Sequence, residues 1–578
     1  MSRSIRFSDT DLLRMGLPAW RSRFVMLLLF AAFGALAARA LYLQLIATDF
    51  LHRQAKIRME RTLTLPASRG RITDRNGVVV ASSLPARSIW YDAREFQPSP
   101  QQLSSLARLL GMDLATLQDK IARDTKTFVY LKRQVPVDTA EQIAALRIQG
   151  LGSLPEYRRQ YPEGSGIAHV VGFTNVEDLG QEGMELAYQQ QLAGTPGERN
   201  VVRDRLGRIV EDLREVRPPV NGRDLQLSID LKIQYLANLA LRNAIDEHKA
   251  KAGGVVVVDA RTGEVLALSN YPTYDPNDRS RLTGAQLRNR VLTDTFEPGS
   301  TMKPFTVALA LETGLVKPST VINCAPGRIT IGTATISDAH PHGALTVEEV
   351  IQKSSNVGTT KMALRLEPQE MWAMFSEVGF GQTPNLAFPG AVAGRVRPWK
   401  TWKPIEQATM SYGHGMSVSL IQMARAYTVF TGNGEVLPLT FMKQGAAPQG
   451  TQVFSAETAK SMRRMLEMAA GPGGTAPKAQ VPGYRVAGKT GTAHKQEGGR
   501  YVNKYISSFV GFAPASNPRL VVAVMIDEPG AGRHYGGEVA APVFSQVVQG
   551  SLRHLMVQPD APFKQLVMVP EKAAKENL

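Results

Sequence analysis

Cysteine is almost absent from this chain, which carries one, Cys324, in 578 residues. A single thiol excludes internal disulfides and any cysteine-rich metal site. We expect Cys324 to be a small packed side chain rather than a nucleophile. Low-complexity stretches are few and 43% of the residues are hydrophobic. Most of the chain should therefore fold, and its length calls for more than one domain.

The signatures of nucleic-acid binding are missing as well. The formal net charge is +16, from 67 basic and 51 acidic residues, which suits an anionic surface or polymer. However, the chain has no finger motif and no aromatic side chains interleaved with a basic cluster. We therefore expect no nucleic-acid partner, and much of the excess charge to be scattered over solvated surface.

Long apolar runs are also scarce, with one exception near the start. Residues 24–38 carry no charge, but a helix of that length rises only about 22 Å, less than the roughly 30 Å hydrocarbon layer. The apolar pattern resumes after Arg39, an arginine that can snorkel. We therefore expect residues 24–46 to span a membrane once, with the arginine-rich residues 1–23 as a cytoplasmic leader.

A cleaved signal peptide is the alternative interpretation of this segment. The triplets Ala35-Leu36-Ala37 and Ala38-Arg39-Ala40 both resemble cleavage sites between small residues. In either case the bulk of the chain is exported.

Residues 47–220 are charged and irregular, and we interpret them as a non-catalytic module. An Asn-Gly turn before residues 78–81 predicts a hairpin strand, and leucine spacing over 103–110 and 114–121 predicts two short amphipathic helices. Residues 180–186 indicate a turn and a helix start without metal-site geometry. The module suits a spacer between the membrane and the next domain.

Residues 221–558 read as one α+β domain. We expect a strand at 225–229 and a helix at 231–248, followed by two strand pairs far apart in sequence. Since strands at both ends flank a mostly helical insertion, 286–471, we predict one sheet assembled from distant segments. The strand pairs are 254–259 with 264–269 and 506–512 with 520–526. The tail, 559–578, is rich in Pro, Lys and Glu and should be loose.

A hydroxyl and an amine are spaced for chemistry in the stretch 295–305. Ser300 follows a Glu-Pro-Gly turn and should cap a helix, with Lys303 about one turn further on the same face. Pro304 costs least near a helix start. A helix dipole lowers the lysine pKa, and a neutral amine can activate a serine. Alone, however, Ser-x-x-Lys arises by chance about once or twice in such a chain.

Two further motifs follow in order. Ser354 and Asn356 form a Ser-x-Asn motif that we place at a helix entry, and Lys489-Thr490-Gly491 resembles the end of a strand, where glycine allows a close backbone approach. Ser-x-x-Lys, Ser-x-Asn and Lys-Thr-Gly in this order are typical of active-site serine enzymes. A Ser-His-Asp triad is less well supported, because no Gly-x-Ser-x-Gly elbow occurs.

The chain resembles the class B penicillin-binding proteins, and within them the septal peptidoglycan transpeptidases of the FtsI type. The resemblance covers nearly the whole chain, namely the anchor and residues 69–77, 183–186, 296–305, 353–358 and 489–492. It implies an α+β transpeptidase domain of the penicillin-binding and serine β-lactamase type, with an antiparallel sheet between helical layers. It also implies an elongated N-terminal pedestal of the dimerisation type, and no metal or other cofactor.

The same resemblance implies catalytic roles in acyl transfer from a D-alanyl-D-alanine stem peptide. Ser300 would attack the penultimate D-alanine carbonyl and Lys303 would accept its proton. Ser354 would relay a proton to the leaving D-alanine, with Lys489 shaping the transfer, and Asn356 would hold the substrate amide. The acyl-enzyme would then pass to the amine of a neighbouring stem peptide.

Binding roles are implied in the same way. The backbone N–H groups of Ser300 and Thr492 would form the oxyanion hole, where one lost donor costs roughly 3 kcal/mol. The Thr490 and Thr492 hydroxyls would contact the substrate carboxylate, beside Gly491.

Three cleft residues are implied less directly. Tyr412-Gly413-His414-Gly415 has a histidine where relatives often have a second tyrosine, so His414 either alters the cleft and titrates near neutral pH or is a loop residue without a role in the chemistry. Tyr535 resembles a residue of a cleft-edge loop. His340 and His342 flank a proline and are more typical of a surface loop than of a metal site.

Other functions use the same residues. A D,D-carboxypeptidase or β-lactam-hydrolysing relative would use water as acceptor, and a β-lactam sensor or divisome scaffold would need no turnover. The resemblance favours a transpeptidase in the bacterial inner membrane, with the N-terminus cytoplasmic and the catalytic domain periplasmic. Its implied partners are peptidoglycan stem peptides, β-lactams as covalent inhibitors, a membrane glycosyltransferase and other divisome proteins.

Overall fold

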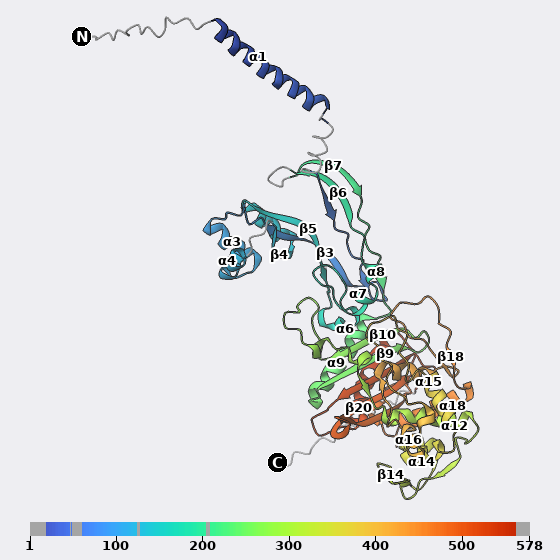
Figure 1. Cartoon of the computed structure of the whole chain (residues 1–578). Coiled ribbons are helices and arrows are strands. Elements are labelled where there is room, and N and C mark those ends of the chain that lie inside the picture. The colour runs from blue at the N-terminus through green and yellow to red at the C-terminus, as the bar shows by residue number, and fades with distance from the viewer. Residues whose placement is uncertain (1–18, 47, 49–59, 124–127, 204–208, 562–578) are drawn as a thin grey trace, which may run out of the picture. The chain divides into compact units, whose positions relative to one another are not determined.

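The computed structural model describes residues 19–46, 48, 60–123, 128–203 and 209–561 (Figure 1). The chain divides into two compact units. The first unit comprises Met1–Pro66 and Pro196–Val220, and the second comprises Ala67–Thr195 and Asn221–Leu578. The expected tail lies outside the described residues except for 559–561.

The first unit contains an apolar helix and a small sheet. Helix α1, Ala19–Leu41, is exposed along its length and continues as one π-helical segment, Tyr42–Ile46. Among the described residues, Ala19–Leu45 is the one helical stretch long and apolar enough to cross a membrane. It begins five residues before the predicted span and runs through both candidate cleavage sites. The antiparallel sheet joins β1 (Glu60–Leu65), β6 (Gly197–Arg203) and β7 (Ile209–Arg217).

The second unit begins with a sheet in which β3 is central. The predicted hairpin is present, with Gly77 at φ 87° before β3, and both predicted amphipathic helices form. The strands are β2 (Ile72–Thr73), β3 (Val79–Tyr91), β4 (Val129–Pro136), β5 (Leu151–Gln160) and β8 (Leu225–Gln226). The helices are α3 (Pro100–Leu110), α4 (Leu114–Arg123), α5 (Val137–Ala145), α6 (Ala168–Val171), α7 (Gly183–Ala187) and α8 (Gln189–Leu192).

The strand predicted at residues 225–229 was wrong in its length. β8 has two residues and pairs in parallel with β2, so it belongs to this first sheet and not to the catalytic one. Leu225, Leu227 and Ile229 are nevertheless all buried. Ser228 is buried as well, so burial does not alternate along this segment, and the strand that it joins, β2, lies far earlier in the chain.

A buried ion-pair network supports this part of the unit. Glu185, at the predicted helix start, is fully buried and pairs with Arg69 at 2.5 Å and with Arg159 at 2.7 Å. These pairs were not predicted from the sequence. Because an unpaired buried charge is strongly destabilising, the three side chains depend on one another.

One five-stranded antiparallel sheet dominates the rest of the unit, as predicted. Its order is β10-β9-β21-β20-β19, so it combines strands from both ends of the domain. The bounds are β9 (Ala252–Asp259), β10 (Val265–Tyr271), β19 (Ala487–Glu497), β20 (Arg500–Ala513) and β21 (Leu520–Asp527). β9 and β21 are buried along their whole length.

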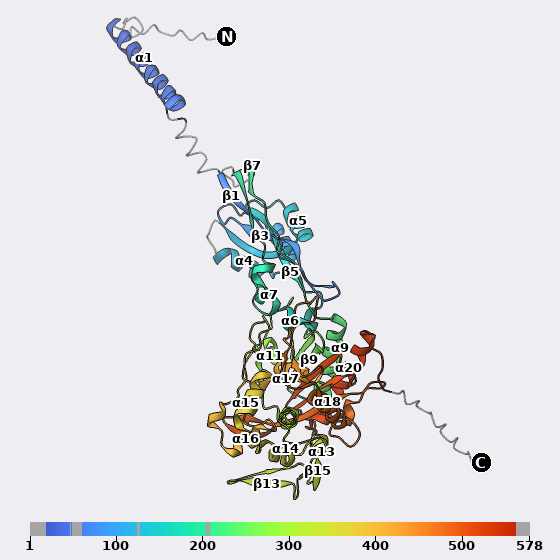
Figure 2. The ribbon, with the colours of Figure 1, turned by 90° about the vertical axis from the view of Figure 1, so that its right-hand side faces the viewer.

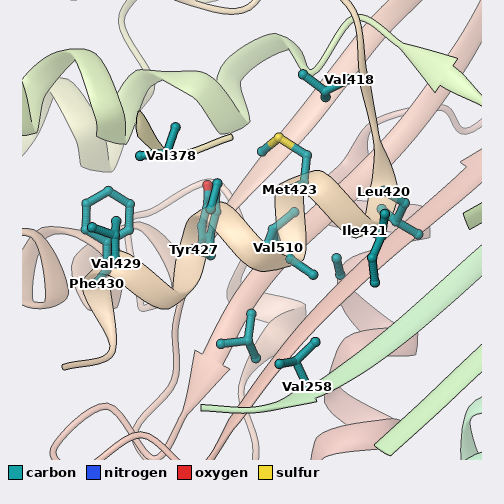
Figure 3. Packing of buried hydrophobic residues seen from close by; sticks show 14 of the residues in the cluster. Val258, Val378, Val418, Leu420, Ile421, Met423, Tyr427, Val429, Phe430 and Val510 are labelled. Carbon is teal, nitrogen blue, oxygen red and sulfur yellow. The ribbon is translucent and has the colours of Figure 1, made fainter. Parts of the chain in front are cut away.

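Helices cover both faces of this sheet. Val255 and Val257 of β9 face a core shared with α9 (Leu231–His248) and α20 (Ala541–His554), which lie side by side (Figure 2). Val256 and Val258 face the larger core, which includes α17 (Leu420–Tyr427). Figure 3 shows Val258 and Val510 of the sheet beside α17. The period of two in a strand thus produces the predicted sheet between helical layers.

Helices are the main regular structure of the inserted segment, but they cover less than half of it, so the prediction that it is mostly helical was too strong. Short hairpins and loops make up the rest of this segment. Its helices are α10 (Gly284–Leu287), α11 (Arg290–Thr293), α12 (Lys303–Glu312), α13 (Val347–Lys353), α14 (Asn356–Ala363), α15 (Pro368–Glu377), α16 (Pro404–Met410), α17 and α18 (Ala456–Ala470). Its strands are β11 (Thr295–Phe296), β12 (Val321–Asn323), β13 (Arg328–Ile331), β14 (Ala334–Ser337), β15 (Ala344–Thr346), β16 (Val418–Ser419), β17 (Glu435–Val436) and β18 (Thr451–Gln452). A short helix, α19 (Gly536–Val539), precedes α20.

Candidate active site

Ser300 lies within a 3₁₀ turn, Gly299–Met302, that leads directly into α12. The prediction that Ser300 caps this helix was wrong, because the turn starts after Pro298 and has no side-chain cap. The Ser300 hydroxyl has no hydrogen-bond partner among the described residues. It is therefore available for chemistry, while Pro304 takes the predicted place at the helix start.

Lys303 is fully buried, and its ammonium group points to the second motif. Its Nζ lies 2.5 Å from the Ser354 carbonyl oxygen and 3.0 Å from Ser354 Oγ. Burial lowers the pKa of Lys303 well below its usual value, and the nearby charge of Lys489 lowers it further, whereas Asp338 opposes this shift. The neutral amine is thereby favoured, as a general base requires.

Ser354 and Asn356 occupy different positions from those predicted. Only Asn356 opens a helix, α14, whose N-cap is Ser355. Ser354 ends α13 in the left-handed region, at φ 61°. This conformation is strained for a residue other than glycine. In Ser354 it directs the side-chain hydroxyl towards Lys303.

Asp338, which the sequence did not single out, fixes the Ser-x-Asn motif. Its carboxylate accepts hydrogen bonds from Ser355 Oγ at 2.8 Å and from the Val357 N–H at 2.9 Å. The Asn356 side-chain amide donates to the Ser337 carbonyl at 2.8 Å. Ser337 and Asp338, at the end of β14, therefore position the motif by three hydrogen bonds, and Asn356 retains its oxygen for a ligand.

Lys489 lies in the first half of β19, which continues to Glu497, so the prediction of a strand end was wrong. The side chain is fully buried, and burial lowers its pKa to about 7. Its Nζ contacts Thr475 Oγ1 at 3.5 Å and Thr490 Oγ1 at 3.3 Å. Among the described residues no carboxylate forms an ion pair with Lys489, so burial is the cause of this shift.

Thr475, a second residue that was not predicted from the sequence, connects Lys489 to Thr490. Its Oγ1 lies 3.0 Å from Thr490 Oγ1. When Thr475 donates to Thr490, the Thr490 hydroxyl proton is free for a ligand. A proline- and glycine-rich loop carries Thr475, and only the fold places that loop beside β19.

Gly491 lies against the turn that carries the nucleophile. A Cβ at this position would come within 2.4 Å of Ser508 Oγ and 2.7 Å of the Pro298 carbonyl oxygen. The predicted need for glycine is confirmed. The Thr492 backbone is also close to Gly299, and Thr492 Oγ1 accepts a hydrogen bond from the Gly536 N–H at 3.0 Å. All three motifs therefore meet in one place.

The segment 412–415 packs on the same turn. The Gly299 N–H donates to the Gly413 carbonyl at 3.2 Å. Tyr412 is 8% exposed, and burial raises its pKa to about 12. Burial lowers the pKa of His414 from its usual value, with smaller effects from Lys303 and His494, while Glu297 opposes the shift. His414 is therefore neutral at neutral pH, rather than half protonated.

Glu297, directly before the Pro-Gly turn, joins three segments. Its carboxylate accepts from the Gly415 N–H at 2.8 Å and from the Tyr501 hydroxyl at 3.0 Å, and it lies 3.8 Å from His414 Nδ1. Tyr501 comes from the β19–β20 hairpin. The carboxylate thus connects the nucleophile turn to two sides of the site.

Tyr535 lies beside the third motif and is 61% exposed. It precedes α19, whose Gly536 contacts Thr492, and its ring lies 4.6 Å from that of His534. Its position agrees with a cleft edge, although no contact defines a role.

The remaining candidates take no part in this arrangement. Cys324 is fully buried and packs in the main core, as predicted. In the part of the chain that the structure describes, no group of three His, Cys, Asp or Glu residues could hold a metal ion, and His340 and His342 belong to no such group.

Two family models match the chain. The penicillin binding protein transpeptidase domain covers residues 253–549, and the penicillin-binding protein dimerisation domain covers residues 64–227. The chain belongs to the class B penicillin-binding proteins. The resemblance, the fold class and the presence of a pedestal of the dimerisation type are thereby confirmed.

Relatives of this penicillin-binding protein match along nearly its whole length. The probable peptidoglycan D,D-transpeptidase PenA of Neisseria meningitidis serogroup A is 45% identical over 547 residues, 94% of each chain. The peptidoglycan D,D-transpeptidase FtsI of Escherichia coli strain K12 is 40% identical over 550 residues, 94% of this chain and 93% of its own.

Solved structures match the catalytic part of the chain. The apo transpeptidase domain of Burkholderia pseudomallei penicillin-binding protein 3 is 53% identical, with a TM-score of 0.54. The match covers 58% of this chain and 98% of that one. A Burkholderia ambifaria structure titled as a peptidoglycan glycosyltransferase is also 53% identical, with a TM-score of 0.53, and covers 58% of this chain and 99% of its own.

Proposed function

We propose that this penicillin-binding protein is a membrane-anchored peptidoglycan D,D-transpeptidase that cross-links stem peptides through an acyl-serine intermediate. One observation carries the proposal. The free hydroxyl of Ser300 lies three residues before a buried Lys303, whose Nζ contacts Ser354, and the Lys489 strand packs on the same turn. The names of the two long relatives support the same reaction.

Acylation begins with a proton transfer. The neutral Lys303 amine takes the Ser300 proton as Oγ attacks the penultimate D-alanine carbonyl, and a C–O bond forms. The backbone N–H groups of Ser300 and Thr492 stabilise the oxyanion, since their segments pack together at Gly299. Loss of one such donor typically costs roughly 3 kcal/mol.

Breaking the C–N bond requires a proton for the departing D-alanine amine. Lys303 passes the proton it accepted to Ser354 across 3.0 Å, and Ser354 gives its own proton to the amine. A positive charge on Lys489 favours this proton transfer, because a second ammonium nearby makes the protonated form of Lys303 less stable. An incoming stem-peptide amine then attacks the ester, the protons move in reverse, and Ser300 is released.

Substrate binding uses the rest of the site. Thr490, Thr492 and Lys489 face the terminal carboxylate, and Asn356 offers its free amide oxygen to a substrate N–H. Gly491 allows the strand to approach the turn. We assign the cleft walls to Tyr412 and His414 on one side and to Tyr535 on the other.

We further propose a septal role in cell division, with a membrane glycosyltransferase and other divisome proteins as partners. The N-terminus would be cytoplasmic and residues 47–578 periplasmic. Within them we assign 47–220 to the pedestal, 221–558 to the transpeptidase domain and 559–578 to a tail. Similarity to FtsI supports the septal assignment.

Intact-mass measurement after benzylpenicillin treatment tests the nucleophile. We expect one covalent adduct, mapped to the peptide that contains Ser300, and none in Ser300→Ala with an unchanged unfolding temperature. An adduct that persists in Ser300→Ala, or that maps elsewhere, would overturn the assignment.

A second assay separates amine from water as acceptor. With a stem-peptide substrate and an amine acceptor, a transpeptidase yields more cross-linked dimer than hydrolysed product. Release of free D-alanine without dimer would instead identify a carboxypeptidase.

A further inference from the structure

A second pocket lies outside the catalytic site, within the same compact unit. Its volume is about 390 Å³, in the range of small-ligand sites. The end of β5, the turn at residues 174–176 and the loop at residues 276–279 line it. None of the residues assigned to the transpeptidase site is among its lining.

Three arginines and no acidic residue line this pocket. Arg158 is exposed and has no hydrogen bond or ion pair among the described residues. Arg279 donates only to the carbonyls of Pro276 and Thr174, at 2.7 and 3.1 Å. Two guanidinium groups therefore face one cavity without a carboxylate partner.

The third arginine, Arg159, is fixed by the buried network. It is 7% exposed, and its Nε pairs with Glu185 while Nη1 donates to Ser83. Its Nη2 is buried and has no partner in the described part of the chain. Several nearby carboxylates are engaged elsewhere: Glu156 and Glu177 pair with Arg133, Asp275 accepts from the Asn277 N–H and Asp278 accepts from the Ser280 N–H. Asp178 interacts electrostatically with Arg159, not with Arg158 or Arg279.

Amide side chains supply further donors. Gln134, Gln160 and Asn175 line the pocket with the arginines. Gln160 makes no side-chain hydrogen bond with another described residue, and Asn175 uses only its oxygen, which accepts from the Leu179 N–H at 2.9 Å. Free amides beside arginine forks are suited to a ligand that carries both carboxylate and peptide groups.

We propose that this pocket binds the carboxylate end of a second peptidoglycan stem peptide, separate from the one in the catalytic cleft. The assignment of the ligand rests on the proposed transpeptidase function, because that reaction presents the protein with a polymer of such peptides. The volume fits a terminal dipeptide. We assign recognition of the ligand to Arg158, because its side chain forms no hydrogen bond or ion pair with another described residue.

The test uses the full-length protein in detergent with its active serine already acylated by benzylpenicillin. Acylation is verified by mass. It shows that the catalytic site is intact, and it also prevents the peptide from binding there. Calorimetric titration then measures binding of a soluble stem pentapeptide that ends in D-alanyl-D-alanine, and of the same peptide with its carboxylates amidated. A failure here leaves the acylation result standing, so the two proposals are judged separately.

We expect the acylated protein to bind the pentapeptide, and Arg158→Glu to weaken binding at least tenfold. Arg158→Lys should lose less, because it keeps the charge but not the fork. Arg242→Glu, an equal change of charge on exposed helix α9, should bind as the parent does. Absence of binding to the acylated protein, equal losses in the two Glu variants, or equal binding of the amidated peptide would each overturn the proposal.

Discussion

Lys303 Nζ lies 3.0 Å from Ser354 Oγ, although 51 residues separate them in the chain. Both side chains lie at the start or end of a helix, so their backbones are fixed by α12, α13 and the turn between α13 and α14. The pair joins the base for acylation to the proton donor for the leaving amine. The rate of acylation should therefore depend on both groups and on the residues that hold them.

Replacement of Lys303 by arginine should reduce the second-order rate of benzylpenicillin acylation by at least a thousandfold. Arginine retains a positive charge but does not lose its proton, so no base remains. Stopped-flow or mass-based kinetics measure the rate. Lys232→Arg, on an exposed position of α9, is the matched control. A rate within tenfold of the parent would exclude Lys303 as the base.

Asp338→Asn should act in two ways. It weakens the hydrogen bonds to Ser355 and Val357, with an expected loss of about 1–3 kcal/mol in unfolding free energy. It also removes the charge that opposes the pKa depression of Lys303. The acid limb of the pH profile of the acylation rate should therefore move to lower pH, because the pKa of Lys303 falls further. A pH profile that is unchanged, or that moves to higher pH, would contradict this electrostatic role.

Thr475→Val should lower acylation about tenfold for β-lactams that carry a carboxylate. Valine has a similar shape but cannot donate to Thr490, whose hydroxyl proton then has no fixed direction. Thr475→Ser should restore most of the rate, because it keeps the hydroxyl. If serine and valine are equally impaired, the effect is one of packing rather than of the hydroxyl.

Gly491→Ala should abolish acylation, since the added Cβ would meet Ser508 Oγ at 2.4 Å and the Pro298 carbonyl at 2.7 Å. The Pro298 carbonyl belongs to the backbone and cannot rotate away as a side chain can, so the turn that carries Ser300 would have to move. Gly284→Ala, where no atom lies within 4 Å, is the control and should be fully active. Unchanged acylation kinetics in Gly491→Ala would show that the turn tolerates displacement.

Stability should rise with pH between about 7 and 10. Burial lowers the pKa of Lys489 to about 7 in the folded protein, so in this range the unfolded chain binds more protons and each pH unit favours the folded state. Tyr412, whose pKa is raised to about 12, has the opposite effect above pH 10. Denaturant unfolding at a series of pH values measures both trends.

Lys489→Met should reduce the rise below pH 10, and the remainder should come from Lys303, whose pKa is also lowered. Lys232→Met, on an exposed position of α9, should leave the rise unchanged. An equal slope in the parent and in Lys489→Met would show that Lys489 is not the group responsible.

Much of the site was predictable because its signals are local. Ser300 and Lys303 share one helix entry, the Lys489 motif lies on one strand, and Gly491 permits one close approach, so residue type and spacing identified them. Helix α9 was predicted with its observed bounds, Leu231–His248, and in the structure Asp230, directly before it, caps its first turn. The order of the three motifs then indicated the family.

The partners of these residues could not be read from spacing. Asp338 and Thr475 act on Ser355 and Thr490 through contacts between loops, and Glu185 joins Arg69 across 116 residues. The same limit applies at residues 225–229, where a strand was predicted but neither its short length nor its pairing with β2.

The sequence by itself determined which residues are the candidates for the chemistry, because hydrophobic periodicity and motif spacing are properties of short segments. The tertiary structure decided which groups lie beside each buried amine and therefore how readily each holds a proton. That depends on desolvation and on hydrogen bonds from distant segments, and only the packed chain brings them together.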